Sequence, residues 1–199
     1  MIVKRKKSIA LNKKIMKKLS ILSALVAISF YGFAQNVPSP EFKNKVMFVE
    51  TNNTLSDLDK TDMTTTLKTS MTGHSEVNIV ANGKSSAQKH MGAPTENFIV
   101  KIEPGIDPEN VVELFQFNNS KKDRKILVAE MSMGKDNTVE LKKSKLSYKK
   151  ISDGVYEVSC KEQLEGGEYC FLVNRPNITV MGAANSQALV GYCFSVEGK

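Results

Sequence analysis

Apolar and polar residues alternate in short runs along most of this chain, with a period of two rather than the 3.6-residue period of a helix. β-Branched and aromatic residues fill these runs, and Gly, Asn, Asp and Pro separate them every 8 to 15 residues or so, about the spacing seen in sandwiches and barrels. The pattern therefore predicts strands over residues 46–50, 64–69, 76–81, 98–102, 113–117, 125–131, 138–142, 146–150, 155–160, 168–173, 178–180 and 192–196.

Residues tolerant of positive φ mark the turns between these runs. They occur in Asn82-Gly83, Ser152-Asp153-Gly154 and Glu165-Gly166-Gly167, and Asp153-Gly154 is the strongest hairpin signal. Two short helical turns are predicted, over residues 54–60 and 107–111, the second opening with Asp107 as cap and Pro108 as first helical residue. The fold class that follows is all-β, an antiparallel β-sandwich forming one domain over residues 41–199.

A signal-peptide layout precedes this domain. Lys13, Lys14, Lys17 and Lys18 form a basic region, residues 19–33 form a mostly apolar run, and Gly32-Phe33-Ala34 is a small-x-small cleavage site. We predict a signal peptide over residues 1–34 and a flexible leader over 35–40. Residues 1–15 are either a long basic region or the product of an upstream start.

The apolar run is too short and too rich in serine for the roughly 20 residues of a spanning helix, so a membrane anchor is the weaker alternative. No cysteine follows the run to carry a lipid. The expected product is exported to the periplasm or beyond the cell, without a lipid anchor or a stable membrane span.

The net charge of +7 comes from 28 basic and 21 acidic residues, but eight of the basic residues lie within residues 1–34, which hold no acid. The remainder carries 20 basic and 21 acidic residues, a net charge of −1. This balance argues against nucleic acid as a partner, because non-specific binding to phosphates needs a positive field.

Three cysteines, Cys160, Cys170 and Cys193, leave three possible pairings in an oxidising compartment, with one thiol unpaired. The similar segments Tyr-Cys-Phe at 169–171 and 192–194 would bring Cys170 and Cys193 onto one face if their strands were antiparallel neighbours in register. Cys170 and Cys193 are therefore the candidate disulfide. Cys160 is expected on a core face as a buried thiol.

Several turn-and-strand motifs recur in one known group of proteins. They are Phe98-Ile99-Val100-Lys101, Arg124 before a strand, Leu164-x-x-Gly-Glu-Tyr, Cys193-Phe194-Ser195-Val196 and, more faintly, Gly83-Lys84-Ser85-Ser86. Over residues 97–199 the chain resembles the uncharacterised exported β-sandwich proteins of Bacteroidetes bacteria. It departs from their usual form in having Gly166 in place of Pro and Cys170 in place of a small residue. The resemblance implies secretion and a β-sandwich, and it implies no activity.

Motifs for cofactor or metal chemistry are weak in this sequence. His74 and His90 lack the spacing of zinc ligands, and Gly83-Lys84-Ser85 lacks the preceding glycine of a phosphate loop, so it is interpreted as a hairpin turn. Asp57, Asp59 and Asp62 gather oxygen atoms but lack the glycine and glutamate of a calcium loop, which favours a solvated or capping loop. We therefore predict no cofactor and no metal.

Two charged groups remain as candidates for surface chemistry. A run of lysines could contact an anionic glycan or headgroup, although protection of an edge strand is the favoured interpretation; it comprises Lys142, Lys143, Lys145, Lys149 and Lys150. Glu162, Glu165 and Glu168 flank a glycine turn and could form the carboxylate pair of a glycosidase, but the chain has no Trp to bind sugar rings.

The leading hypothesis is an exported, non-enzymatic binding or accessory module of the bacterial cell envelope, with an envelope protein or glycan as partner. One alternative is a small envelope hydrolase with acid and base residues on its loops, which a pocket joining His74 or His90 to a carboxylate would favour. Another is a structural or assembly component that uses an edge strand or an apolar patch, near Met131 and Met133 for example.

Overall fold

The computed structural model describes residues 38–120, 122–132, 135–137, 139, 141–176, 178 and 188–198, with only the backbone described for 135–137. The predicted signal peptide, residues 35–37 of the predicted leader, and Met133 lie outside these ranges. The described residues fall in one compact unit of the chain.

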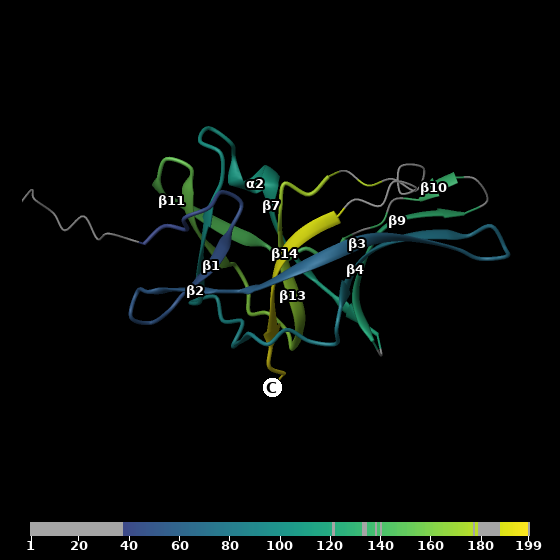
Figure 1. The fold of residues 1–199 in the computed structure, drawn as a ribbon, viewed down its shortest axis with the longest axis horizontal. Coiled ribbons are helices and arrows are strands. Elements are labelled where there is room, and N and C mark those ends of the chain that lie inside the picture. Colours follow the sequence, from purple (N-terminus) through teal and green to yellow (C-terminus); the bar gives the residue numbers. More distant parts are fainter. Residues whose placement is uncertain are drawn as a thin grey trace, which may run out of the picture. The chain divides into compact units, whose positions relative to one another are not determined.

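The fold is all-β, as the alternating pattern predicts, and its strands form two sheets (Figure 1). Within the described residues the helical structure is the single turn α2 (Pro108–Val111). The Asp107 side chain caps α2 by accepting a hydrogen bond from the backbone N–H of Glu109, and Pro108 occupies the first turn. The helical turn predicted over residues 107–111 is thus confirmed.

One sheet has five strands, and all its pairings are antiparallel. Their order is β11 (Leu146–Ser152), β12 (Val155–Cys160), β6 (Asn97–Lys101), β1 (Val46–Val49) and β2 (Leu55–Asp57). The hairpin between β11 and β12 turns at Asp153-Gly154, where Ser152 pairs with Val155 and Gly154 has a φ of 72°. This two-residue turn confirms the strongest hairpin prediction.

The second sheet has nine strands. Seven follow the order β10 (Lys135–Asn137), β9 (Asp123–Ser132), β4 (Ser75–Asn82), β3 (Asp59–Thr69), β14 (Ala188–Val196), β13 (Gly167–Val173) and β7 (Val112–Gln116). Off this path, β8 (Asn118–Asn119) pairs with β9, and β5 (Lys89–His90) runs parallel to β14. The nine-stranded sheet is curled into a half-barrel.

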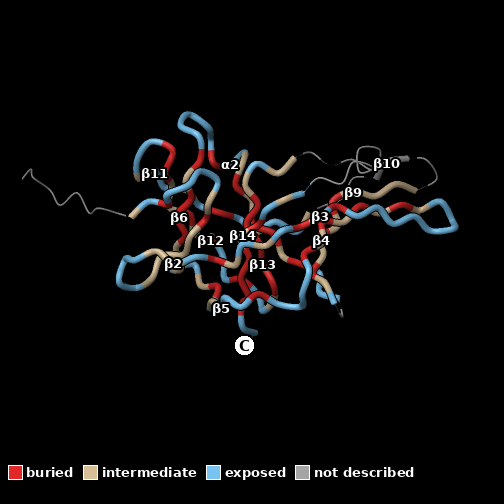
Figure 2. Tube along the Cα trace, in the orientation of Figure 1, coloured by how far each residue is buried: buried red, intermediate tan, exposed pale blue. Residues whose placement is uncertain are grey.

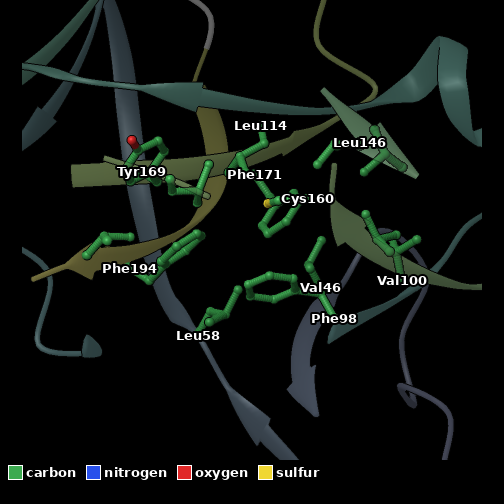
Figure 3. Packing of buried hydrophobic residues seen from close by; sticks show 14 of the residues in the cluster. Val46, Leu58, Phe98, Val100, Leu114, Leu146, Cys160, Tyr169, Phe171 and Phe194 are labelled. Atoms are coloured by element: carbon green, nitrogen blue, oxygen red, sulfur yellow. The ribbon is translucent and has the colours of Figure 1, made fainter. Parts of the chain in front are cut away.

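The central core fills the space between the two sheets (Figure 3). Val46, Phe98 and Val158 come from the five-stranded sheet, and Phe171 and Phe194 from the nine-stranded sheet. Cys160 is also buried there, as its alternation with Val158 predicts. Burial of these apolar side chains is the main stabilising contribution to the fold.

A second apolar cluster lies on the other face of the nine-stranded sheet, where the sheet curls over itself. It contains Met63, Val77, Ile79, Phe115, Cys170, Leu172 and Cys193 among others. Strands β7, β13 and β14 therefore bury both faces, with Phe171 in the central core and Cys170 in the second cluster. Figure 2 shows this burial along β13 and along the C-terminal half of β14, whereas the first residues of β14 are partly exposed.

Some local predictions are wrong. Residues 54–60 form no helical turn, because residues 55–57 pair with Val49, Phe48 and Met47 of β1 and the chain continues into β3. Pairing with a neighbouring strand outweighs the local capping signals of this segment. The Gly83 turn does not close a hairpin, because β4 pairs with β3 and β9, and the chain leaves Asn82 for β5 beside β14.

Two predicted strands lie partly outside the described residues. Positions 138 and 140 of the segment 138–142 are not described, and its described positions are not in a strand. Positions 179 and 180 of the segment 178–180 are likewise outside the description. The other predicted strands are confirmed, and β3 begins five residues before the predicted segment 64–69.

Candidate functional site

The lysine run predicted as a surface site is largely neutralised by acidic partners. Strand β11, which carries Lys149 and Lys150, is an edge of the five-stranded sheet, the position at which lysines block further strand pairing. Four of the five ammonium groups pair with carboxylates: Lys143 with Glu113, Lys145 with Glu162 at 3.1 Å, Lys149 with Glu157 at 3.3 Å and Lys150 with Asp153 at 3.2 Å. Lys142 is exposed. This arrangement gives little support to binding of an anionic ligand.

The three aspartates and the three glutamates do not converge on metal or substrate sites. Asp57 pairs with Lys45 at 2.6 Å, while Asp59 accepts hydrogen bonds from the Ser86 hydroxyl and the Ala87 N–H. Glu162 pairs with Lys145 at the surface, whereas the Glu168 side chain is buried. Within the described ranges no three His, Cys, Asp or Glu side chains are grouped to hold a metal.

Glu168 is the centre of a buried polar network. Its Oε2 accepts hydrogen bonds from the backbone N–H of Ser86 at 2.7 Å and from Nη1 of Arg124 at 3.3 Å. Its Oε1 accepts one from the Ser195 hydroxyl at 2.5 Å. Ser86, Arg124, Glu168 and Ser195 are all less than one-tenth exposed, so the network fastens residues 83–88 to strands β9, β13 and β14.

The sequence does not predict this network, and among its members only Glu168 was a candidate site residue, as one carboxylate of a glycosidase pair. Ser86, Arg124, Glu168 and Ser195 come from four separate segments of the chain and meet in one place. The Ser86 hydroxyl donates to Asp59, so Ser86 joins the network through its backbone N–H. The Arg124 Nε has no hydrogen-bond partner among the described residues, and its Cζ lies 5.3 Å from the centroid of the Phe117 ring. The network is thus a structural connection between distant segments.

His74 and His90 occupy different environments. His74 follows the β3–β4 turn, and its Nε2 lies 3.3 Å from a Glu76 carboxylate oxygen at the protein surface. His90, on β5, packs at the margin of the central core, with ring centroids 4.1 Å from Phe48 and 5.4 Å from Phe194. Its Nε2 is buried and has no hydrogen-bond partner in the structure.

A cavity of about 390 Å³ opens beside His90. We call it the His90 pocket, and its lining residues are Phe48, Glu50, Thr51, Gln88, Lys89, His90, Met91, Glu96 and Glu197. The pocket lies at the junction of the two sheets, because Phe48 belongs to β1 while β5 pairs with β14. It joins a histidine to carboxylates, the arrangement that would favour a small envelope hydrolase.

Glu96 is held in a defined orientation in this pocket. Its Oε1 accepts a hydrogen bond from the backbone N–H of Met91 at 2.9 Å, while its Oε2 is buried without a partner. A carboxylate oxygen without a partner remains available as an acceptor for a hydrogen-bond donor that a ligand supplies.

Burial lowers the pKa of His90 from its ordinary value, against the opposing influence of the Glu96 and Glu50 carboxylates. The folded protein therefore binds this proton less readily than the unfolded chain, so His90 lowers stability as the pH falls through about 6.5. We expect wild-type protein to lose more unfolding free energy between about pH 7.5 and 5.5 than a His90→Gln variant does. Urea denaturation of both proteins at the two pH values measures this difference, and equal losses would contradict it.

Two other cavities have lining groups that are already engaged. In a cavity of about 450 Å³, Tyr148 donates its hydroxyl to the Val112 carbonyl, Asp153 pairs with Lys150, and Asp107 caps α2. In a cavity of about 340 Å³, the Arg175 Nε donates to Glu113 at 2.8 Å. Of these three sites, the His90 pocket is the one that holds buried polar atoms without partners.

Among the residues that the structure describes, no helix has the length and apolar character needed to cross a bilayer. Comparison of the chain with protein-family models, curated proteins and solved structures gives no match.

Proposed function

We propose that the protein is an exported binding module of the bacterial cell envelope, and that its His90 pocket holds the protonated amine of a ligand. The carboxylates of Glu50 and Glu96 and the rings of Phe48 and His90 line one cavity, and this convergence carries the proposal. Carboxylates form strong charge-assisted hydrogen bonds with ammonium groups, and aromatic faces attract cations. The basic and apolar N-terminal segment supports export, as does the resemblance to exported sandwich proteins.

The charge of the lining selects a cation over an anion. Glu50, Glu96 and Glu197 contribute three carboxylates, whereas Lys89 contributes one ammonium, which lies 3.4 Å from Glu197. The lowered pKa of His90 keeps its ring neutral at pH 7. The lining is therefore negatively charged, and an anionic ligand would be repelled.

The polar and apolar parts of the lining match a ligand that carries both an amine and a short apolar body. The unpartnered Oε2 of Glu96 accepts from an ammonium N–H, and the Met91 backbone holds the other oxygen in place before the ligand arrives. Phe48 and the exposed, flexible Met91 side chain can cover apolar atoms.

A hydrolase is the second candidate, because the pocket joins His90 to the carboxylates of Glu50 and Glu96. A neutral imidazole has the protonation state that a general base requires. Two observations favour binding over this chemistry: the Nε2 atom is buried among aromatic rings, and the sole lining hydroxyl is that of Thr51. Turnover of p-nitrophenyl esters or glycosides that is lost in His90→Gln would establish the hydrolase instead.

Titration of the full chain with n-butylammonium, with n-butanol as a matched uncharged probe, tests the binding function. We expect butylammonium, but not butanol, to shift the NMR signals of His90 and Met91. Glu96→Gln should weaken butylammonium binding by about tenfold, because the ammonium group loses a charged partner. Glu103→Gln is the control, because Glu103 is exposed, pairs with Lys43 and does not line the pocket. Equal binding of the two probes, or a Glu96→Gln variant that binds like wild type, would overturn the proposal.

A further inference from the structure

Strands β13 and β14 place Cys170 and Cys193 directly opposite each other. The two residues are Cα partners in the antiparallel register, and their Sγ atoms are 2.6 Å apart. Both side chains are fully buried in the second cluster, on the concave face of the nine-stranded sheet. The similar Tyr-Cys-Phe segments are therefore in register, as a cross-strand pairing requires.

Backbone hydrogen bonds show which type of antiparallel pair this is. The N–H of Phe117, which follows β7, donates to the Glu168 carbonyl, so Glu168 directs its backbone polar groups toward β7. Cys170 lies two residues further along β13 and does the same, so its backbone polar groups point away from β14. The Cys193 carbonyl accepts from the Ser86 hydroxyl, and the Ser195 N–H donates to the Gln88 carbonyl, so Cys193 directs its own groups away from β13.

Cys170 and Cys193 thus form a non-hydrogen-bonded pair. In such pairs the Cα atoms approach to about 4.5 Å, and the side chains are closer than in hydrogen-bonded pairs. A disulfide needs Cα atoms about 4.4–6.8 Å apart, so the backbone of β13 and β14 already has the spacing of a bridged pair.

The surroundings leave room for two sulfur atoms and little else. Gly191 on β14 lies against this site, and a Cβ atom there would overlap the Cys170 Sγ and the Met63 Cε. Cys160 lies in the central core on the opposite face of β13, with the sheet between it and the pair. Of the three possible pairings, the fold thus brings one pair of sulfur atoms together.

The geometry points to an oxidation site: we propose that Cys170 and Cys193 form a disulfide as the exported chain folds, and that Cys160 stays a free thiol. A Cys thiolate attacks a disulfide-bearing oxidant, and the second Cys thiolate then displaces the oxidant from the mixed disulfide. The two thiols lose two protons and two electrons, and the oxidant leaves as a dithiol.

The order of events follows from burial. Burial raises the pKa of Cys170 well above its ordinary value, and both thiols are inaccessible once the second cluster has formed. Because the thiolate is the reactive form, the bridge must form before β13 and β14 are covered. The folded bridge should in turn resist reductants unless the protein is unfolded.

Thiol counting on the full chain exported from a bacterial host tests this assignment. The protein is unfolded in denaturant, alkylated with iodoacetamide with or without prior reduction, and mapped by mass spectrometry. We expect one alkylated cysteine, Cys160, without reduction and three after it. Three alkylated cysteines without reduction would overturn the proposal, as would a bridge that includes Cys160.

A Cys160→Ser variant provides the matched control, since it removes the cysteine of the central core and leaves the cross-strand pair intact. It should show no alkylation before reduction and two alkylated cysteines after it. If Cys160→Ser fails to fold, the wild-type peptide map still decides the pairing, because the linked peptides carry residues 170 and 193. Partial alkylation of Cys170 and Cys193 in folded, unreduced protein would also contradict the assignment.

Discussion

Replacing Glu168 with alanine is expected to lower the free energy of unfolding by about 3–5 kcal/mol, because it leaves a buried charge without its partner. The Arg124 side chain, which is 4% exposed, would lose the carboxylate beside Nη1. The Ser86 N–H and the Ser195 hydroxyl would lose the acceptor that they share. Urea denaturation followed by circular dichroism measures the change.

Glu165→Ala is the matched control, since Glu165 is exposed and lies three residues before Glu168, outside strand β13. Its removal is expected to change stability by less than about 0.5 kcal/mol. A double-mutant cycle with Arg124→Met separates the interaction between Arg124 and Glu168 from the loss of the other hydrogen bonds. Similar stabilities of Glu168→Ala and Glu165→Ala would show that the buried network does not hold residues 83–88 to strands β9, β13 and β14.

Replacing Phe98 with alanine is expected to cost about 3–5 kcal/mol, the usual range for removing a large aromatic side chain from a packed core. Phe98 is 1% exposed and lies where both sheets meet. Its ring centroid is 4.8 Å from that of Phe171, 5.4 Å from that of Phe194 and 5.6 Å from that of Phe48. The variant removes the ring that these three side chains share.

Phe42→Ala is the control for this substitution, because the Phe42 side chain is 62% exposed and lies outside both clusters. Its effect should stay within about 0.5 kcal/mol of wild type. Phe98→Leu should be milder than Phe98→Ala, because less cavity volume is created. A Phe98→Ala protein as stable as Phe42→Ala would place the main stabilising contacts elsewhere.

The alternation of residue types is enough to predict most of the strands. In β12 and β4, buried apolar residues recur at every second position along most of the strand, because one side of each strand faces an apolar cluster. The Asp153-Gly154 turn and the Asp107-Pro108 helix start are equally local, since a positive φ and an N-cap depend on neighbouring residues only.

Local patterns fail where pairing with a distant segment decides the structure. Residues 55–57 carry serine and aspartate in an order that suggests a helical turn, yet they add a strand to β1. In β13, burial of both faces replaces alternation with a nearly continuous apolar run, which reflects the curl of the nine-stranded sheet. The strand at residues 55–57 was not predicted, whereas β13 was predicted as a strand without the sheet that covers its second face.

The candidate sites show the same division. Sequence named Cys170 and Cys193 as a pair on the condition that their strands are neighbours, and the register of β13 and β14 meets that condition. The Glu168 network joins Ser86, Arg124 and Ser195 across gaps of up to 109 residues, and the His90 pocket joins Glu50 to Glu96. The sequence shows which residue types are present, but hydrogen bonds and charge interactions act over only a few ångströms in space, whatever the separation along the chain. Strand pairing within the nine-stranded sheet therefore decided where the cysteines and the Glu168 network meet, and the packing of the two sheets decided the His90 pocket.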